Sequence, residues 1–165
     1  MKGKQEVRLA GFGGQGIILA GHILGKAASL FDKKNAVFTQ SYGPEARGGS
    51  CSADVVISEE TIHYPKVIEP DVLVLMSQGA LGTYGGNIKS GGVLILDKDL
   101  VTLMEEPPGL TIYRAPATRI AEEMGKRIVA NIVMLGAVAA LGGVVGYESM
   151  KKAVLDSIPA GTEEF

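Results

Sequence analysis

Three glycines in the pattern Gly11-x-Gly13-x-x-Gly16 separate a short apolar segment from a longer one rich in Ala and Leu. Glycines at this spacing let backbone N–H groups approach an anion, and a helix that begins directly after them adds partial positive charge. The same glycines can also serve a purely structural purpose, a tight turn with close packing of helix on strand. On this motif alone, an anion site and a structural turn are both open.

The positions after this glycine loop argue against two common kinds of nucleotide site. A dinucleotide-binding loop is normally followed, about 20 residues later, by an acid at the end of the second strand. Here that strand ends at residues 39–41 without an acid, and Asp32 comes before the strand. A Walker phosphate loop needs Lys and then Ser or Thr, whereas Ile17 follows Gly16. A free-standing nucleotide-binding module therefore stays only as an alternative.

A second polar segment, residues 40–49, brings a phenol, a carboxylate, a guanidinium and three glycines together within ten positions. Because it follows the second strand, it should lie at the same carboxyl edge of the sheet as the glycine loop. Binding groups often collect on such loops, although an exposed Glu45–Arg47 ion pair of little energetic value is a structural alternative. With Gln15 of the first loop, the candidate binding residues here are Ser41, Tyr42, Gly43, Glu45, Arg47, Gly48 and Gly49.

Groups that could perform catalysis are scarce. The single cysteine, Cys51, excludes an internal disulfide and also excludes an iron–sulfur cluster held by this chain alone. A lone cysteine of this kind is expected to be a small core residue. His22 and His63 lie too far apart for a metal site and are expected to be structural or solvated. We therefore expect no catalytic residue and no metal ligand in this chain.

The composition excludes further classes of protein. The 165 residues carry 16 Lys and Arg against 18 Asp and Glu, a net charge of −2, which argues against a nucleic-acid-binding protein. Hydrophobic residues make up 46% of the chain, too many for a disordered protein. Residues 1–6 lack the apolar stretch of a signal peptide. With a single cysteine, we expect a cytoplasmic location.

Hydrophobic patterning predicts strands that alternate with helices. Strands are expected at residues 6–10, 34–40, 53–58, 71–77, 92–96 and 110–113, and helices at 17–31, 117–124 and 148–157. This alternation is typical of an α/β fold with three layers, in which helices cover both faces of a mostly parallel, Rossmann-like sheet. We expect one such domain over residues 1–165.

Residues 128–146 form an uncharged run that is long enough to cross a bilayer. Asn131 lies inside this run, and Gly136, Gly142 and Gly143 interrupt it. The α/β pattern before it is that of a soluble domain, so we favour a helix buried in the fold or against a partner.

Taken together and in this order, the motifs resemble the gamma subunit of 2-oxoacid:ferredoxin oxidoreductases. The resemblance covers residues 7–157, and loop 40–49 is more similar to the 2-oxoglutarate members than to the pyruvate members. The matching residues are Gly11-Phe12-Gly13-Gly14-Gln15-Gly16, Tyr42-Gly43-Pro44-Glu45-Ala46-Arg47-Gly48-Gly49, Val55-Val56-Ile57-Ser58, Pro65 and Pro70-Asp71-Val72-Leu73-Val74.

The resemblance implies an enzyme that decarboxylates a 2-oxoacid oxidatively, joins the acyl group to coenzyme A and passes electrons to ferredoxin. Thiamine diphosphate and iron–sulfur clusters would be held largely by partner subunits, one binding thiamine diphosphate and one ferredoxin-like. This chain would be a non-catalytic subunit whose two loops line a cleft between subunits, next to coenzyme A or the thiamine diphosphate. A subunit that serves only as an assembly surface is the other alternative.

The same resemblance suggests a task for each loop. The backbone amides of Gly13, Gly14 and Gly16 would meet phosphate oxygens. Arg47 would pair with an anionic group, and Glu45 would orient Arg47 or a residue of a partner.

Overall fold

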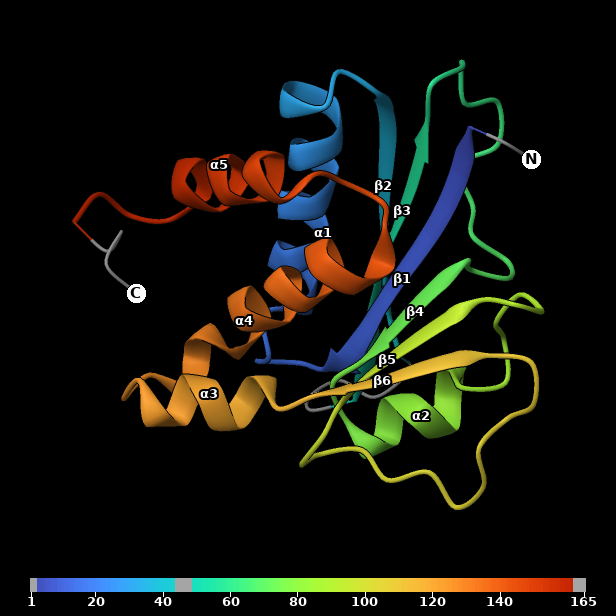
Figure 1. Cartoon of the computed structure of the whole chain (residues 1–165), viewed down its shortest axis with the longest axis vertical. Helices are drawn as coiled ribbons and strands as arrows, with labels where there is room; N and C mark the ends of the chain where they lie inside the picture. The colour runs from blue at the N-terminus through green and yellow to red at the C-terminus, as the bar shows by residue number, and fades with distance from the viewer. Residues whose placement is uncertain (1–2, 44–48, 162–165) are drawn as a thin grey trace.

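The computed structural model describes residues 3–43 and 49–161 and contains a six-stranded sheet in the order β2-β3-β1-β4-β5-β6 (Figure 1). Its strands are β1 (Lys4–Phe12), β2 (Asn35–Tyr42), β3 (Ser50–Ser58), β4 (Val72–Leu75), β5 (Val93–Asp97) and β6 (Thr111–Ala115). All six lie close to the segments expected from the sequence. Strand β4 ends before the expected limit at residue 77, because Ser77 already caps the helix that begins at Gln78.

Strand directions place the ends of β1 and β2 at the same edge of the sheet. Strands β1, β4, β5 and β6 run parallel, whereas β3 is antiparallel to both of its neighbours, β1 and β2. Two reversals leave β1 and β2 pointing the same way. Phe12 at the end of β1 pairs with Ser50, and Tyr42 at the end of β2 pairs with Cys51. The mostly parallel sheet that the sequence predicts is therefore confirmed.

Helices cover both faces of this sheet (Figure 1). The α-helices are α1 (Ile17–Lys26), α2 (Gln78–Tyr84), α3 (Ala117–Glu123), α4 (Ala130–Ala137) and α5 (Tyr147–Ser157), with shorter turns η1 (Ala27–Phe31), η2 (Arg127–Val129) and η3 (Val138–Gly142). Strand β4 is covered by helices on both of its faces. Val72 and Val74 pack with α1, α3, α4 and α5, while Leu73 and Leu75 pack with α2 on the opposite face. A strand covered on both sides is apolar at every position.

Helix α2 is absent from the sequence prediction. Its seven residues include two glycines, Gly79 and Gly82, which lower the helix propensity of the segment. The hydroxyl of Ser77 accepts a hydrogen bond from the N–H of Ala80 at 3.1 Å and so caps the helix. Tertiary packing of Ala80 and Leu81 against the sheet makes up for the weak local preference.

The uncharged run at 128–146 folds into η2, α4 and η3 and packs against α1, α3 and α5. Met134 and Leu135 are fully buried, and Gly143 ends the run in a left-handed conformation with φ 66°. In the part of the chain that the structure describes, no helix combines the length and hydrophobicity needed to cross a membrane.

Candidate functional site

The turn from β1 into α1 depends on a glycine at position 16. Gly16 adopts a left-handed conformation with φ 74°, which L-residues rarely take. A Cβ here would lie 2.3 Å from Nδ2 of Asn131. That amide nitrogen donates to the carbonyl of Gly16 at 3.1 Å, which anchors the start of α1 to α4. Gly16 is therefore required by the fold itself.

The side chain of Gln15 also stabilises this turn. Its Oε1 accepts the N–H of Phe12 at 2.9 Å, and its Nε2 donates to the carbonyl of Met76 at 2.7 Å. A Cβ on Gly11 would lie 2.4 Å from that Oε1, so Gly11 leaves room for the glutamine side chain. Both ends of the Gln15 amide are thus engaged inside the chain, and Gln15 positions the loop.

Nothing in the described chain requires a glycine at position 13. A Cβ on Gly13 would meet no atom within 4 Å, and its φ is not positive. Gly14 also faces open space, although its φ of 99° favours glycine. Among the described residues, the N–H of Gly14 has no acceptor. The middle of this loop is therefore open to something that approaches its backbone closely.

The two glycine-bearing loops meet at one edge of the sheet. The N–H of Gly13 donates to the carbonyl of Gly49 at 3.2 Å, and the N–H of Gly43 donates to the carbonyl of Ser50 at 2.8 Å. The expected juxtaposition of the loops is therefore confirmed for their described parts. The N–H of Gly13 is already used inside the chain, which leaves the amides of Gly14 and Gly16 for a ligand.

Two cavities lie beside this junction. The first, called the Gly14 cavity, has a volume of about 260 Å³ and is lined by Phe12, Gly14, Gln15, Thr118, Arg127, Ile128 and Ala130. The second, called the Ser50 cavity, has a volume of about 460 Å³ and is lined by Phe12, Ser50, Ser77, Gln78, Gly79, Thr83 and Leu100. Phe12 belongs to both and forms a wall between them. Sequence analysis identified neither Arg127 nor the hydroxyls of the Ser50 cavity.

Among the candidate residues, Tyr42 is exposed at the end of β2, as is the neighbouring Ser41. Glu45, Arg47 and Gly48 lie outside the described residues, as do Pro44 and Ala46. The structure therefore brings the described ends of loop 40–49 to the glycine loop.

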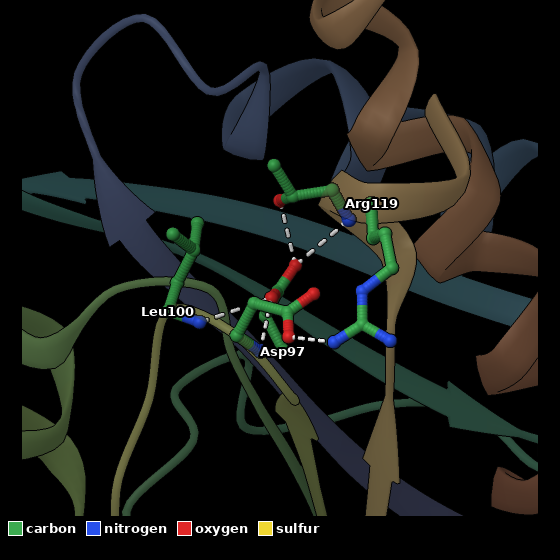
Figure 2. Close-up of polar contacts among 5 residues, drawn as sticks. Asp97, Leu100 and Arg119 are labelled. Atoms are coloured by element: carbon green, nitrogen blue, oxygen red, sulfur yellow. Dashed lines mark hydrogen bonds and ion pairs between the residues drawn. The ribbon is translucent and has the colours of Figure 1, made fainter. Parts of the chain in front are cut away.

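Asp97 holds α3 against this edge of the sheet. The carboxylate is fully buried and accepts the N–H of Leu100 at 3.2 Å and both the N–H and the hydroxyl of Thr118, at 3.0 and 2.7 Å (Figure 2). Arg119, the next residue of α3, pairs with Asp99 beside it. Because every carboxylate oxygen is used in this way, Asp97 fixes the position of Thr118 at the Gly14 cavity.

The described residues offer little for redox or metal chemistry. Cys51 is only 3% exposed, and burial raises the pKa of its thiol, so the reactive thiolate is disfavoured. The expectation of a small core residue is confirmed. His22 packs edge-on against Phe38, with ring centroids 5.8 Å apart. Within residues 3–43 and 49–161, no group of three or more His, Cys, Asp or Glu side chains is placed to hold a metal ion.

Comparison with known proteins places this α/β domain in the class of oxidoreductase gamma subunits. A family model described as pyruvate ferredoxin/flavodoxin oxidoreductase matches residues 6–164, and the chain belongs to this family. The 2-oxoglutarate synthase subunit KorC of Methanocaldococcus jannaschii is 59% identical, over 99% of this chain and 89% of the relative.

Solved structures agree with this assignment. The gamma subunit of a keto/oxoacid ferredoxin oxidoreductase from Geobacter sulfurreducens has a TM-score of 0.84 at 44% identity, over 97% of this chain and 90% of that one. A 2-oxoglutarate:ferredoxin oxidoreductase from Magnetococcus marinus, solved with 2-oxoglutarate, coenzyme A and succinyl-CoA bound, also has a TM-score of 0.84. Its identity is 25%, and the match covers 94% of this chain but 27% of the longer chain.

Proposed function

We propose that this chain is the gamma-type subunit of a 2-oxoglutarate:ferredoxin oxidoreductase, with one gamma-type domain over residues 1–165. The complex oxidatively decarboxylates 2-oxoglutarate, transfers the acyl group to coenzyme A and passes the electrons to ferredoxin. The observation that carries the proposal is the 59% identity to a 2-oxoglutarate synthase subunit over nearly the full length of both chains. The isolated chain is expected to be inactive.

Coenzyme A fits the open side of the glycine loop. The N–H groups of Gly14 and Gly16 have no acceptor among the described residues, and amides at the start of a helix bind phosphate oxygens well. Arg47 would add a guanidinium from the neighbouring loop, with Glu45 to orient it. Coenzyme A would supply the thiol that accepts the acyl group, and this chain would hold and orient its anionic part.

The other cofactors of such an enzyme do not fit the described residues. A four-thiolate iron–sulfur cluster cannot form in a chain with one cysteine, which is buried in the core. The metal that accompanies thiamine diphosphate would need a set of oxygen ligands, and the described residues contain no group of three or more His, Cys, Asp or Glu side chains placed to bind it. We assign both cofactors to partner subunits, one that binds thiamine diphosphate and one that resembles ferredoxin. We also propose a cytoplasmic location, which is compatible with a chain that has one free thiol and no possible internal disulfide.

The test is to purify the chain with its native partners and assay ferredoxin reduction with 2-oxoglutarate, pyruvate or 2-oxoisovalerate, each with coenzyme A. We expect kcat/KM for 2-oxoglutarate to exceed the other values by about tenfold or more, since a site built for a second carboxylate leaves its charged groups unpaired with the alternatives. A complex that prefers pyruvate would overturn the substrate, and full activity without this chain would overturn its part in the reaction.

The contribution of loop 40–49 is tested in the same complex. Arg47→Ala is expected to raise the KM for coenzyme A while leaving the KM for 2-oxoglutarate unchanged, because the lost guanidinium would face only the anionic cofactor. Unchanged kinetics in this variant would remove Arg47 from the site.

A further inference from the structure

Strand β2 forms one edge of the sheet and carries none of the features that normally protect such an edge. Within the described chain it pairs only with β3, and its register runs from Asn35 to Tyr42 without a bulge. Its eight residues include no charged residue, no proline and no glycine. Natural edge strands are usually blocked by a charge, a proline or a bulge, because their free backbone groups otherwise pair with another strand.

The opposite edge of the sheet, formed by β6, is protected (Figure 1). Strand β6 has only five residues, and one of them, Arg114, is exposed and forms an ion pair with Glu106 of the preceding loop at 2.7 Å. A short edge strand with a charged side chain resists pairing with a further strand. The lack of protection is therefore particular to β2 and is not shared by both edges of this sheet.

The hydrogen-bond pattern shows which backbone groups of β2 face away from the sheet. The N–H of Gly43 donates to the carbonyl of Ser50, and this pair continues the register of β2 and β3 by one position. In an antiparallel pair, every second residue exchanges both of its hydrogen bonds with its partner. The odd-numbered residues of β2 therefore bond to β3, and the even-numbered residues direct their N–H and C=O groups outward. These outward residues are Ala36, Phe38, Gln40 and Tyr42.

The side chains of these four residues lie on the face of the sheet that α1 covers. Ala36 and Phe38 pack against the core on this face, and side chains alternate along a strand, so Gln40 and Tyr42 share it. Tyr42 is 65% exposed. A groove of about 270 Å³, called the Ala36 groove, opens on this face and is lined by His22, Gly25, Lys26, Ser29, Leu30, Ala36 and Phe38. This face thus has a groove near the start of β2 and an exposed aromatic ring at its end.

We propose that β2 pairs antiparallel with β2 of a second copy of this chain, about a two-fold axis at Thr39, so that two six-stranded sheets join into one. In this register, Ala36 of one copy lies opposite Tyr42 of the other, and Phe38 lies opposite Gln40. Every outward N–H and C=O group of both strands then has a partner.

The position of the axis follows from the backbone groups that are still free. An axis at Phe38 would place Tyr42 opposite Lys34, whose N–H already donates to the carbonyl of Ala28 at 3.0 Å. The axis at Thr39 uses only the four outward residues of each copy. It is therefore the register in which no hydrogen bond within either chain has to break.

Two features favour a second copy over an unrelated strand as the partner of β2. Tyr42 of each copy lies opposite Ala36 of the other, on the face where the Ala36 groove opens, so each exposed ring is buried beside a small side chain. Lys33 and Lys34, which precede β2, lie at opposite ends of an antiparallel pair, whereas a parallel pair would bring these like charges together. A closed two-fold dimer is also the commonest assembly of identical chains.

Cysteine cross-linking tests the register. The axis places Thr39 opposite itself in a pair without hydrogen bonds, with Cα atoms about 4.5 Å apart, which a disulfide can span. Thr39→Cys is expected to form a covalent dimer on mild oxidation, in the free chain and in the complex purified with its native partners. Thr111→Cys, at an exposed threonine of β6, is the matched control and is expected to stay a single chain. Cys51 is 3% exposed and does not compete.

A proline tests the backbone pairing itself. Gln40→Pro removes an N–H that faces away from β3, so each chain keeps its own sheet. The dimer loses one hydrogen bond from each copy, and its dissociation constant is expected to rise about tenfold or more. Gln40→Ala keeps the N–H and is expected to dimerise like the unaltered chain. Analytical ultracentrifugation measures the dissociation constants, and circular dichroism checks that both variants are folded.

Three results would overturn the inference. The first is cross-linking of Thr39→Cys that is no faster than that of Thr111→Cys, and the second is an equal dissociation constant for Gln40→Pro and Gln40→Ala. The third is a Thr39→Cys complex that forms no link between two copies of this chain, because another subunit then covers β2 in the enzyme. None of these readouts depends on turnover of 2-oxoglutarate, so this inference and the proposed function can fail separately.

Discussion

At the scale of single residues, Gly16 and Asn131 constrain each other. The glycine needs its left-handed backbone and has no space for a Cβ, while Nδ2 of Asn131 donates to the glycine carbonyl. Gly13, three residues away, is under neither constraint. The glycine motif therefore combines a position that the fold requires with one that it leaves open.

This difference gives a matched pair of variants. Gly16→Ala is expected to lower the free energy of unfolding by about 2 kcal/mol or more, because backbone strain of roughly 1–2 kcal/mol adds to the collision with Asn131. Gly13→Ala is expected to change it by less than about 0.5 kcal/mol. Urea unfolding of both variants, followed by circular dichroism, measures the difference. Equal losses would show that position 13 is structural as well.

Cys51 links stability to pH. Burial raises the pKa of its thiol in the folded chain, so the unfolded chain loses this proton at a lower pH than the folded chain does. Below the ordinary thiol pKa of about 8.5 both states are protonated and the thiol adds no pH dependence. Above that pH, unfolding releases a proton, and the folded state loses stability relative to the unfolded state.

We therefore expect the unaltered chain to lose stability relative to Cys51→Ala as the pH rises from 8 toward 10. Urea unfolding of the two proteins at several pH values over this range measures the effect. A constant difference between them across the range would mean that the thiol titrates alike in both states.

At the scale of elements, an arginine joins β1 to β3. Nε of Arg8 donates to Oδ1 of Asp54, its partner in the strand register, and Nη2 donates to Oδ2, both at 2.8 Å. Nη2 also donates to the carbonyl of Val67, and the guanidinium lies over the ring of Tyr84 in α2, 5.5 Å from its centre. The hydrogen bond to Asp54 raises the pKa of Arg8, so its charge persists at any ordinary pH.

Asp54→Ala is expected to cost about 3–5 kcal/mol of unfolding free energy, since it leaves a mostly buried guanidinium without its carboxylate. The double variant Arg8→Met with Asp54→Leu is expected to cost clearly less, because it removes both charges together. Thermal and urea unfolding of the single and double variants make the comparison. A double variant that is the less stable of the two would show that the pair is a net stabiliser of the sheet.

At the scale of the whole molecule, we expect the proposed site to be completed by a partner subunit. The Gly14 cavity is too small for coenzyme A, and Ile128 at its rim is 77% exposed. In the relative from Magnetococcus marinus, the matching domain makes up 27% of a longer chain. Both observations fit a binding site that is completed by surfaces outside this chain.

Isothermal titration of the isolated chain with coenzyme A is therefore expected to give no sub-micromolar binding, whereas the assembled complex should bind it measurably. Only a ligand that is largely buried gains enough contact area to offset the entropy lost on binding. Titration with NAD in parallel tests the alternative of a free-standing nucleotide-binding module. Sub-micromolar NAD binding by the isolated chain would favour that alternative.

Much of the fold could be predicted from local pattern. The valine- and leucine-rich segment of β4 indicates a strand buried on both faces, and the glycines at 11–16 mark the turn into α1. Helix α2 could not be predicted, because its glycines give a weak local signal and its stability comes from packing on the sheet. The apolar run at 128–146 correctly predicted a buried helix. Asn131 is the one polar side chain in this run, and its contact with Gly16 could not be predicted from the pattern.

The sequence by itself determined which chemical groups the two glycine loops carry and that each loop follows a strand, because the alternation of strands, loops and helices is encoded in the local hydrophobic pattern. Only the tertiary structure decided which groups are still available to a ligand. Asn131 reaches Gly16 across 115 positions, Gln15 bonds to Met76 across 61, and Arg127 joins Gly14 in one cavity. These contacts depend on how helices pack over the sheet, and no local pattern of residues encodes that packing.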